Sequence, residues 1–242
     1  MSAQKIVADK QKLKNAIKQK DGWWATIFSS KIANLFLYFI ADSKSITPNC
    51  VTSSSLFLCF VSGFFIATGT STNLIIGAIL IQLVFVLDCL DGQLARYRNA
   101  GTNFGAWFDR VTDRVKDFII YFSICWGHFH IYNDWRIWPL GMMSLFFVYL
   151  FDYYVNQDIK LEPRTQTSEL RRKTFLSFVF SFGETIYKSI PILQFHIGEQ
   201  YLLISIFLFL NQTRLLFYLI ILLGCFYALY WPVARISGRK PD

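Results

Sequence analysis

Apolar segments of about the thickness of a bilayer recur along this chain, and they constrain its fold more than any other feature. A helix needs about 20 mostly apolar residues to cross the hydrocarbon core. Hydrophobic residues make up 54% of the 242 positions, which is high for a soluble domain. The sequence therefore predicts an all-α polytopic membrane protein with six transmembrane helices. The predicted spans are 49–67, 74–96, 104–126, 138–154, 196–211 and 215–234.

The residues that precede these spans are first basic and then amphipathic. Residues 1–22 are rich in lysine and have no apolar core, which predicts a cytoplasmic tail and no cleavable signal peptide. Residues 23–43 are apolar but are interrupted by polar positions such as Lys31 and Asn34. This pattern favours an amphipathic juxtamembrane helix in the membrane interface, with a true span as the alternative. We therefore expect a six-helix membrane domain over residues 46–236.

Basic residues gather on one side of the predicted membrane. They accumulate in segments 1–22, 155–173 and 235–240, whereas the opposite loops contain only Arg136 and Arg214. Because cytoplasmic loops carry an excess of lysine and arginine, both termini and these segments are expected in the cytoplasm.

One further apolar segment, 174–195, is ambiguous. It is long enough to span, yet Glu184 and Lys188 are four residues apart and can pair on an interfacial helix. Keeping it at the interface leaves all strongly basic loops on one side, so we predict six spans. The net charge of +8 then indicates anionic lipid headgroups rather than nucleic acid as partners. The five scattered cysteines predict neither a disulfide framework nor a zinc site.

Four carboxylates at helical spacing interrupt the apolar sequence. Asp88 and Asp91 are three residues apart, and Asp109 and Asp113 are four apart, so each pair lies on one face of its own helix. Carboxylates at membrane depth are costly unless a cation compensates them. Oxygen ligands favour a hard ion such as Mg²⁺, Mn²⁺ or Ca²⁺ over zinc. The pattern therefore predicts a site for two divalent ions.

A plainer interpretation is that these aspartates are helix-end charges paired with Arg96, Arg110 and Arg114. A fifth aspartate, Asp117, lies one helical turn further on. We expect an ion pair with Arg114 or Lys116 for it, rather than a place in the site.

The same stretch forms a signature, which reads Asp-x2-Asp-Gly-x2-Ala-Arg-x8-Gly-x3-Asp-x3-Asp from position 88. It resembles the motif of the CDP-alcohol phosphotransferase family at every fixed position. The segment from Ile46 to Thr52 resembles the family's entry to its first membrane helix, where Thr47 can cap the helix that Pro48 begins. The fixed positions are Asp88, Asp91, Gly92, Ala95, Arg96, Gly105, Asp109 and Asp113.

The resemblance implies an integral membrane transferase that moves a substituted phosphate from a CDP-linked alcohol to an acceptor alcohol, releasing CMP, in phospholipid biosynthesis. It implies Mg²⁺ or Mn²⁺ as cofactor, a homodimer, and an active site that faces the cytoplasm. The expected metal ligands are Asp88, Asp91, Asp109 and Asp113, with Asp113 also the candidate base for the acceptor hydroxyl. The residues expected to bind the CDP-alcohol are Asn49, Thr52, Asp91, Gly92, Ala95, Arg96 and Gly105.

Candidates for the acceptor site lie later in the chain. Glu199 is an ionisable residue in an apolar helix, which makes it a candidate for orienting the acceptor, with a structural hydrogen bond as the alternative. Arg171 and Arg172 are the other candidates. Two further functions stay open: the same transfer between small polar alcohols of the inositol-phosphate type, and a non-enzymatic cation-binding transporter.

Overall fold

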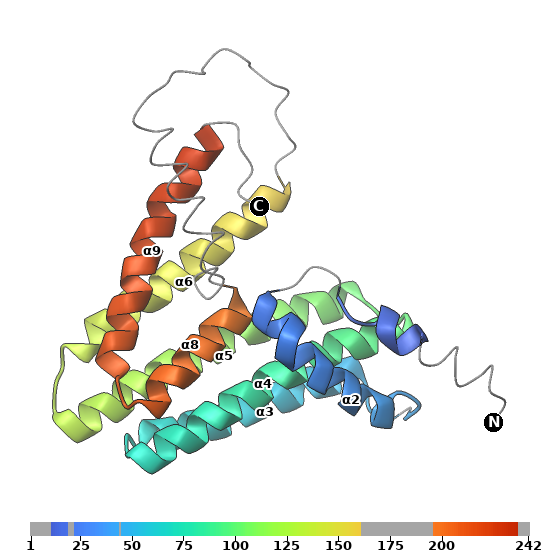
Figure 1. Ribbon diagram of the computed structural model, residues 1–242, viewed down its shortest axis with the longest axis horizontal. Coiled ribbons are helices and arrows are strands. Elements are labelled where there is room, and N and C mark those ends of the chain that lie inside the picture. The colour runs from blue at the N-terminus through green and yellow to red at the C-terminus, as the bar shows by residue number, and fades with distance from the viewer. Residues whose placement is uncertain (1–10, 19–21, 44, 161–195, 237–242) are drawn as a thin grey trace. The chain divides into compact units, whose positions relative to one another are not determined.

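The computed structural model describes residues 11–18, 22–43, 45–160 and 196–236. Within these ranges the chain is helical and no strand is found (Figure 1), which confirms the all-α fold class. The ambiguous segment 174–195 lies outside the described residues. The chain divides into two compact units, Met1–Trp135 with His196–Thr213 and Arg136–Phe195 with Arg214–Asp242, each of which is described by itself.

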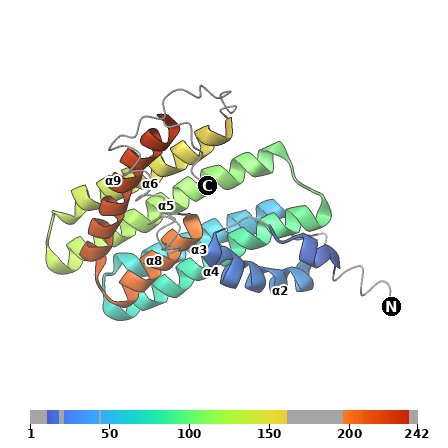
Figure 2. The same cartoon turned by 45° about the horizontal axis from the view of Figure 1, so that its top comes forward.

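The first unit is built around two antiparallel helices, α3 (Pro48–Ala67) and α4 (Ser71–Arg98) (Figures 1 and 2). At the start of α3, the Thr47 side chain accepts a hydrogen bond from the Cys50 amide at 3.2 Å, and Pro48 takes the first helical position. Both features are confirmed as the sequence predicts. Gly69, with a φ of 71°, makes the turn into α4, and a side chain there would overlap the Gly127 carbonyl.

A short turn then leads from α4 into α5 (Asn103–Tyr132). Asn99 ends α4 in the left-handed region with a φ of 50°, and Thr102 begins α5 by accepting a hydrogen bond from the Gly105 amide at 3.0 Å. Both α4 and α5 pack against α3. The last turns of α4 and the first turns of α5 therefore lie at the same end of α3.

Two shorter helices cover α4. A π-helical turn, η1 (Ala25–Ser29), leads into α2 (Ser30–Ile40), and α8 (Ile197–Phe209) packs along another part of α4. Ala33 and Leu37 of α2 are fully buried in one apolar cluster with residues of α4. Other large apolar residues of α2 are exposed. They are Leu35, Phe36, Tyr38 and Phe39.

The second unit contains α6 (Ile137–Lys160) and nearly all of α9 (Thr213–Ile236). Aromatic contacts join the two helices: the ring of Phe151 lies 5.2 Å from that of Tyr227 and 5.5 Å from that of Trp231. Gly224 lets α9 approach closely, because a Cβ atom there would overlap the side chain of Phe147.

All six predicted spans are helical, but they differ in how well they suit a membrane. Among the described helices, three are long and apolar enough to cross: Pro48–Ala67, Ser71–Arg98 and Thr213–Pro232. Helix α8 has 13 residues, or about 20 Å of helix, which is short for a hydrocarbon core of about 30 Å. Charged residues interrupt the apolar sequence of α5. The number of spans therefore stays a prediction.

Candidate functional site

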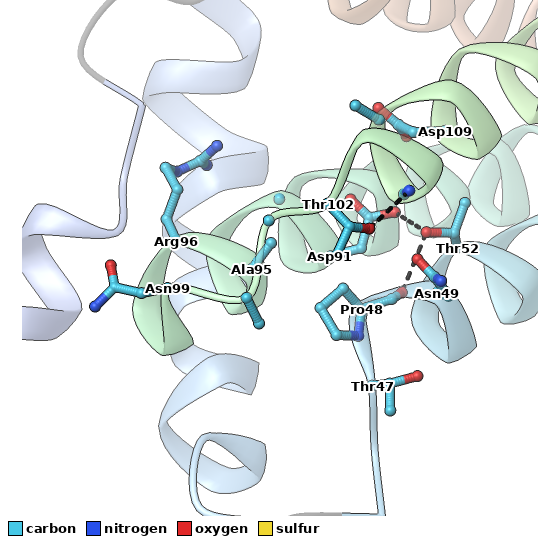
Figure 3. A pocket seen from close by; sticks show the side chains of 15 residues that line it. Thr47, Pro48, Asn49, Thr52, Asp91, Ala95, Arg96, Asn99, Thr102 and Asp109 are labelled. Carbon is cyan, nitrogen blue, oxygen red and sulfur yellow. Dashed lines mark hydrogen bonds between the residues drawn. The ribbon is translucent and has the colours of Figure 1, made fainter.

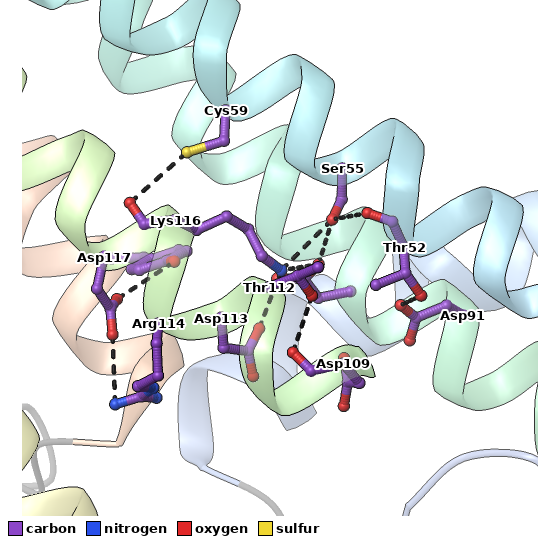
Figure 4. Close-up of polar contacts among 12 residues, drawn as sticks. Thr52, Ser55, Cys59, Asp91, Asp109, Thr112, Asp113, Arg114, Lys116 and Asp117 are labelled. Atoms are coloured by element: carbon purple, nitrogen blue, oxygen red, sulfur yellow. Dashed lines mark hydrogen bonds and ion pairs between the residues drawn. The ribbon is translucent and has the colours of Figure 1, made fainter. Parts of the chain in front are cut away.

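The four aspartates of the signature line one cavity of about 180 Å³. Asp88 and Asp91 lie in the C-terminal half of α4, and Asp109 and Asp113 lie in the first turns of α5. Because α3 packs against both helices, it supports both halves of this carboxylate cluster (Figure 4). Residues that are 25 positions apart in the sequence thus meet in one site.

Two hydroxyl groups of α3 hold the aspartates of α4. Thr52 Oγ1 donates to Asp91 Oδ2 at 2.6 Å, and Ser55 Oγ donates to Asp88 Oδ1 at 2.7 Å. Thr52 and Ser55 are three positions apart on α3, as Asp88 and Asp91 are on α4. Because the two helices are antiparallel, each hydroxyl lies opposite one carboxylate. The sequence predicts Thr52 as a site residue but gives no sign of Ser55.

A lysine that the sequence did not assign to the site lies in the middle of the cluster. Lys116 Nζ is 2.7 Å from Asp88 Oδ1 and 2.9 Å from Asp113 Oδ1, and its side chain is 0% exposed (Figure 4). Lys116 follows Asp113 by three residues and lies on the same face of α5. That spacing indicates a pair between Lys116 and Asp113, but only the fold shows that Asp88 reaches the same ammonium group.

Asp117 has a structural role beside the cluster. Its carboxylate lies 3.4 Å from Arg114 Nη1 and accepts a hydrogen bond from the Tyr201 hydroxyl at 3.5 Å. Of the two partners expected for it, the structure shows Arg114. Lys116 pairs instead with Asp88 and Asp113, so the cluster of four aspartates and one lysine carries a formal charge of −4 + 1 = −3.

A larger cavity of about 680 Å³ lies next to the cluster (Figure 3). All seven residues predicted to bind the CDP-alcohol line it. The two cavities share Asp91, Gly92, Arg96 and Asp109. The lining is Thr47, Pro48, Asn49, Thr52, Asp91, Gly92, Ala95, Arg96, Asn99, Ala100, Gly101, Thr102, Gly105, Ala106 and Asp109.

Gly105 allows two helix starts to approach each other at the wall of this larger cavity. A Cβ atom on Gly105 would lie 3.1 Å from Thr102 Oγ1 and 3.2 Å from Asn49 Oδ1, so glycine allows the start of α5 to come close to the start of α3. The first turns of both helices line the cavity through Asn49 and Gly105. Helix N-termini present free backbone N–H groups and favour anions such as phosphate.

Part of the basic N-terminal segment packs against the site. Arg96 Nε donates to the Ala16 carbonyl at 2.6 Å, and Asn34 Nδ2 donates to the Leu13 carbonyl at 2.9 Å. Leu13 and Ala16 are buried, and Lys18 lines the smaller cavity. Residues 11–18 are therefore a folded part of the site wall, a feature that the charge pattern of the tail did not indicate.

Arg98 holds the segment that leads into α3. Its guanidinium group donates to the carbonyls of Ile40 at 2.9 Å, Ser43 at 2.7 Å and Ala41 at 3.1 Å, and also to that of Ile46. This segment ends at Thr47, where the lining of the larger cavity begins. Arg98 is outside the signature, yet it positions one wall of the site.

We expect Arg98→Met to lower the free energy of unfolding by about 2 kcal/mol or more, because a charged donor loses four carbonyl partners. Thermal unfolding of the purified protein in detergent measures the change. Lys31→Met, which removes an exposed cation of α2, is the matched control and should unfold with the wild type. Equal unfolding temperatures for the two variants would contradict this role of Arg98.

Glu199 lies apart from both cavities. Its side chain is buried, its Oε1 accepts a hydrogen bond from the Trp24 amide at 3.3 Å, and a side chain on Gly22 would overlap its carboxylate. Trp24 Nε1 also donates to Gln82 Oε1 of α4 at 2.9 Å. Glu199 thus holds the start of η1 against α8. The other two acceptor candidates, Arg171 and Arg172, lie outside the described residues.

Comparison with known proteins agrees with this arrangement. The family model described as CDP-alcohol phosphatidyltransferase matches residues 45–230, which include both cavity-lining helix starts and all four aspartates. The chain belongs to the CDP-alcohol phosphatidyltransferase family. As a member of this family with several long apolar helices, it is an integral membrane protein.

Three curated relatives illustrate the similarity. The "Bifunctional IPC transferase and DIPP synthase" of Aquifex aeolicus is 33% identical over 140 residues, which are 57% of this chain and 31% of the relative. The phosphatidylinositol phosphate synthase of Corynebacterium glutamicum is 36% identical over 89 residues, 36% of this chain and 39% of the relative. That of Mycobacteroides abscessus is 32% identical over 96 residues, 39% of this chain and 40% of the relative. The chain therefore spans less than half the length of each.

The residues of the CDP-alcohol phosphatidyltransferase signature all face the two cavities. Asp88 and Asp113 line the smaller one, Ala95 and Gly105 line the larger one, and the other four positions line both. The eight signature residues thus form one continuous lining that runs from the smaller cavity into the larger one.

The carboxylate cluster fits a divalent cation by its chemistry. Its donors are the carboxylate oxygens that Mg²⁺ and Mn²⁺ prefer, and its formal charge stays negative after Lys116 is counted. Within the described residues, however, no three His, Cys, Asp or Glu side chains are grouped as ligands of one ion. Lys116 takes one oxygen from each of Asp88 and Asp113, while Asp91 and Asp109 border the larger cavity.

Proposed function

We propose that this protein is a metal-dependent CDP-alcohol phosphotransferase, which transfers a substituted phosphate group from a CDP-linked alcohol to an acceptor alcohol and releases CMP. The observation that carries the proposal is the wall common to the two cavities. A molecule in the larger cavity reaches the carboxylate cluster at Asp91, Gly92, Arg96 and Asp109. The larger cavity is also of the size usual for small-molecule sites, about 300 to 1,000 Å³.

The residues of the larger cavity suit a nucleotide diphosphate. Gly92 and Ala95 leave room beside α4, and the Arg96 guanidinium group supplies a fixed positive charge for phosphate oxygens. The first turns of α3 and α5 add backbone N–H groups at Asn49 and Gly105. We therefore assign the cytidine end of the donor to the larger cavity and its diphosphate to the wall shared with the cluster.

We propose Mg²⁺ or Mn²⁺ as the cofactor, held by the oxygens of Asp88, Asp91, Asp109 and Asp113. Such a cation supplies the positive charge that neutralises a diphosphate and its leaving group. The protein's own hydroxyls support this set, since Thr52 and Ser55 orient Asp91 and Asp88. Asp113 is proposed to accept the proton of the acceptor hydroxyl.

The proposed reaction serves phospholipid biosynthesis, with at least one lipid among its reactants. Two of the relatives are named for phosphatidylinositol phosphate as their product, and the site lies in an integral membrane protein. A second candidate is the same transfer between small polar alcohols of the inositol-phosphate type. The Aquifex relative supports keeping this candidate, because it is named as an IPC transferase and DIPP synthase and not for phosphatidylinositol phosphate.

A substrate panel tests the proposal and separates the two candidates. Purified protein is incubated with Mg²⁺, either CDP-diacylglycerol or a water-soluble CDP-alcohol, and a set of acceptor alcohols, and CMP and the products are identified by mass spectrometry. Activity with CDP-diacylglycerol supports phospholipid synthesis, and activity confined to soluble pairs supports the second candidate. The proposal fails if no pair yields CMP from protein that is folded and monodisperse.

Three residues are candidates for binding the acceptor. Glu199 is held by the start of η1 and reaches neither cavity, so its use for the acceptor requires a movement of that turn. Ile197, two residues earlier on α8, does line the smaller cavity. Arg171 and Arg172 are retained as acceptor candidates on their charge alone.

We further propose a homodimer with six spans, η1 and α2 in the membrane interface, and the two cavities facing the cytoplasm. The apolar outer surface of α2 supports the interfacial position. In a protein without native cysteines, Ala100→Cys is expected to label from the cytoplasmic side and Thr70→Cys from the opposite side, because these exposed positions flank α4. Labelling of both from the same side would contradict a crossing by α4. Chemical cross-linking in native membranes tests the dimer.

A further inference from the structure

Lys116 is the feature of the site that neither the signature nor the proposed reaction explains. It lies on α5 one turn beyond Asp113, and its ammonium group bridges two aspartates from different helices. Among the described residues, the polar contacts of Nζ are with two aspartates of the cluster and with the serine that donates to one of them: Asp88 Oδ1 at 2.7 Å, Asp113 Oδ1 at 2.9 Å and Ser55 Oγ at 3.4 Å. A charged group in this position acts directly on the binding of other cations.

The ammonium group occupies the position that a cation bridging Asp88 and Asp113 would need. A cation that bound the same Oδ1 atoms would have to displace Nζ from both, and one that bound the Oδ2 atoms instead would lie beside the ammonium charge. The Lys116 side chain is 0% exposed, and a buried ammonium that loses its carboxylates is left without compensation for its lost hydration. Displacement of the ammonium group is therefore disfavoured, and this half of the cluster already holds a positive charge.

The other half of the cluster is open to a ligand. Asp91 and Asp109 line both cavities, and Asp109 makes no side-chain hydrogen bond or ion pair with any described residue. Asp91 uses Oδ2 for Thr52 alone. The two carboxylates thus offer oxygen donors at the wall where the larger cavity meets the smaller one.

We infer that Lys116 is a built-in cation of this site, which replaces one of two divalent ions, so that the chain binds a single Mg²⁺ or Mn²⁺ on the side of Asp91 and Asp109. The inference rests on the proposed function, because it takes the carboxylate cluster as the metal site. It assigns Lys116 as a positioning residue, which fixes Asp88 and Asp113 and supplies a permanent positive charge. It also departs from the two-ion site expected from the aspartate spacing, and it narrows the four ligands proposed above to Asp91 and Asp109.

The test is the number of Mn²⁺ ions bound per chain. Metal-stripped full-length protein in detergent is titrated with Mn²⁺, free Mn²⁺ is followed by electron paramagnetic resonance, and Mg²⁺ is added to show competition for the same site. We expect one Mn²⁺ per wild-type chain and one per chain of Lys116→Arg, which keeps the charge. Lys116→Met keeps the length but loses the charge, and it should bind two.

Arg114→Met is the matched control, since Arg114 lies on the same helix but pairs with Asp117 outside the cluster. It should bind one Mn²⁺, like the wild type. Two ions per wild-type chain overturn the inference even if no variant folds, as does one ion per chain of a folded Lys116→Met protein. Wild-type protein that binds two ions and releases CMP would refute the role of Lys116 alone, whereas protein that binds none and releases no CMP refutes the proposed function as well.

Discussion

Asp109→Asn is expected to lower metal-dependent CMP release by roughly 10²-fold or more, with donor affinity and turnover falling together. Asp109 lines both cavities, and no described residue pairs with its carboxylate, so its negative charge is available for a cation. Asparagine keeps the size of the side chain and removes the charge. The measurements are turnover under saturation and a titration of the CDP-alcohol donor into each protein.

Asp117→Asn is the matched control, because it removes a charge from the same helix two turns further on. Asp117 pairs with Arg114 and lines neither cavity. Its variant should retain donor affinity and turnover close to those of the wild type, and thermal unfolding checks that both variants are folded. Similar activity losses for the two substitutions would show that Asp109 has no specific role at the metal.

Asp113→Asn is expected to have the second large effect, but on turnover alone. If Asp113 accepts the proton of the acceptor hydroxyl, its loss should reduce turnover by about 10² to 10⁴ while metal and donor affinities stay within a few-fold of the wild type. The carboxylate lines the smaller cavity and gives one oxygen to Lys116. Single-turnover measurements with saturating donor isolate the chemical step.

The comparison with Asp109→Asn decides between a base and a further metal ligand. A ligand variant loses donor binding and turnover in parallel, whereas a base variant separates them. If Asp113→Asn weakens donor binding as much as Asp109→Asn does, the assignment of Asp113 as base is wrong. The proton would then leave through another group of the site.

The helices were predictable because their signals are local. The Thr47–Pro48 pair marks the start of α3, and the turn residues near Asn99 mark the end of α4, so the predicted and observed boundaries agree closely there. Length was harder to predict where tertiary packing decides it. Helix α8 has 13 residues, and the apolar sequence around it does not show where the helix begins.

The core of the candidate site was also predictable, because helical spacing places each aspartate pair on one face and the signature links the two pairs. The side chains of other helices that contact these aspartates were not predictable. Ser55 has no distinctive sequence context, and the contact of Lys116 with Asp88 depends on how α3 brings α4 and α5 together. Sequence spacing relates residues on the same helix only. It therefore cannot predict that a lysine on one helix compensates the charge of an aspartate on another.

The N-terminal segment shows a second limit of sequence patterns. Its lysines indicate a solvated tail, yet Leu13 and Ala16 are buried and backbone carbonyls of this segment bind Asn34 and Arg96. Likewise, the ionisable Glu199 suggests a substrate contact, but its carboxylate accepts a hydrogen bond from the backbone at the start of η1. In both cases, the partner is a backbone group, which no side-chain pattern reports.

The most direct test of the account is CMP release by the purified protein from a CDP-alcohol and an acceptor alcohol, measured with Mg²⁺, with excess chelator, and with Mn²⁺ added after the chelator. We predict CMP in equal amount to the phosphodiester product, loss of both with the chelator, and recovery with Mn²⁺. Undiminished CMP release in excess chelator would contradict a metal-bound diphosphate at Asp91 and Asp109, and no CMP under any condition would contradict the transferase itself.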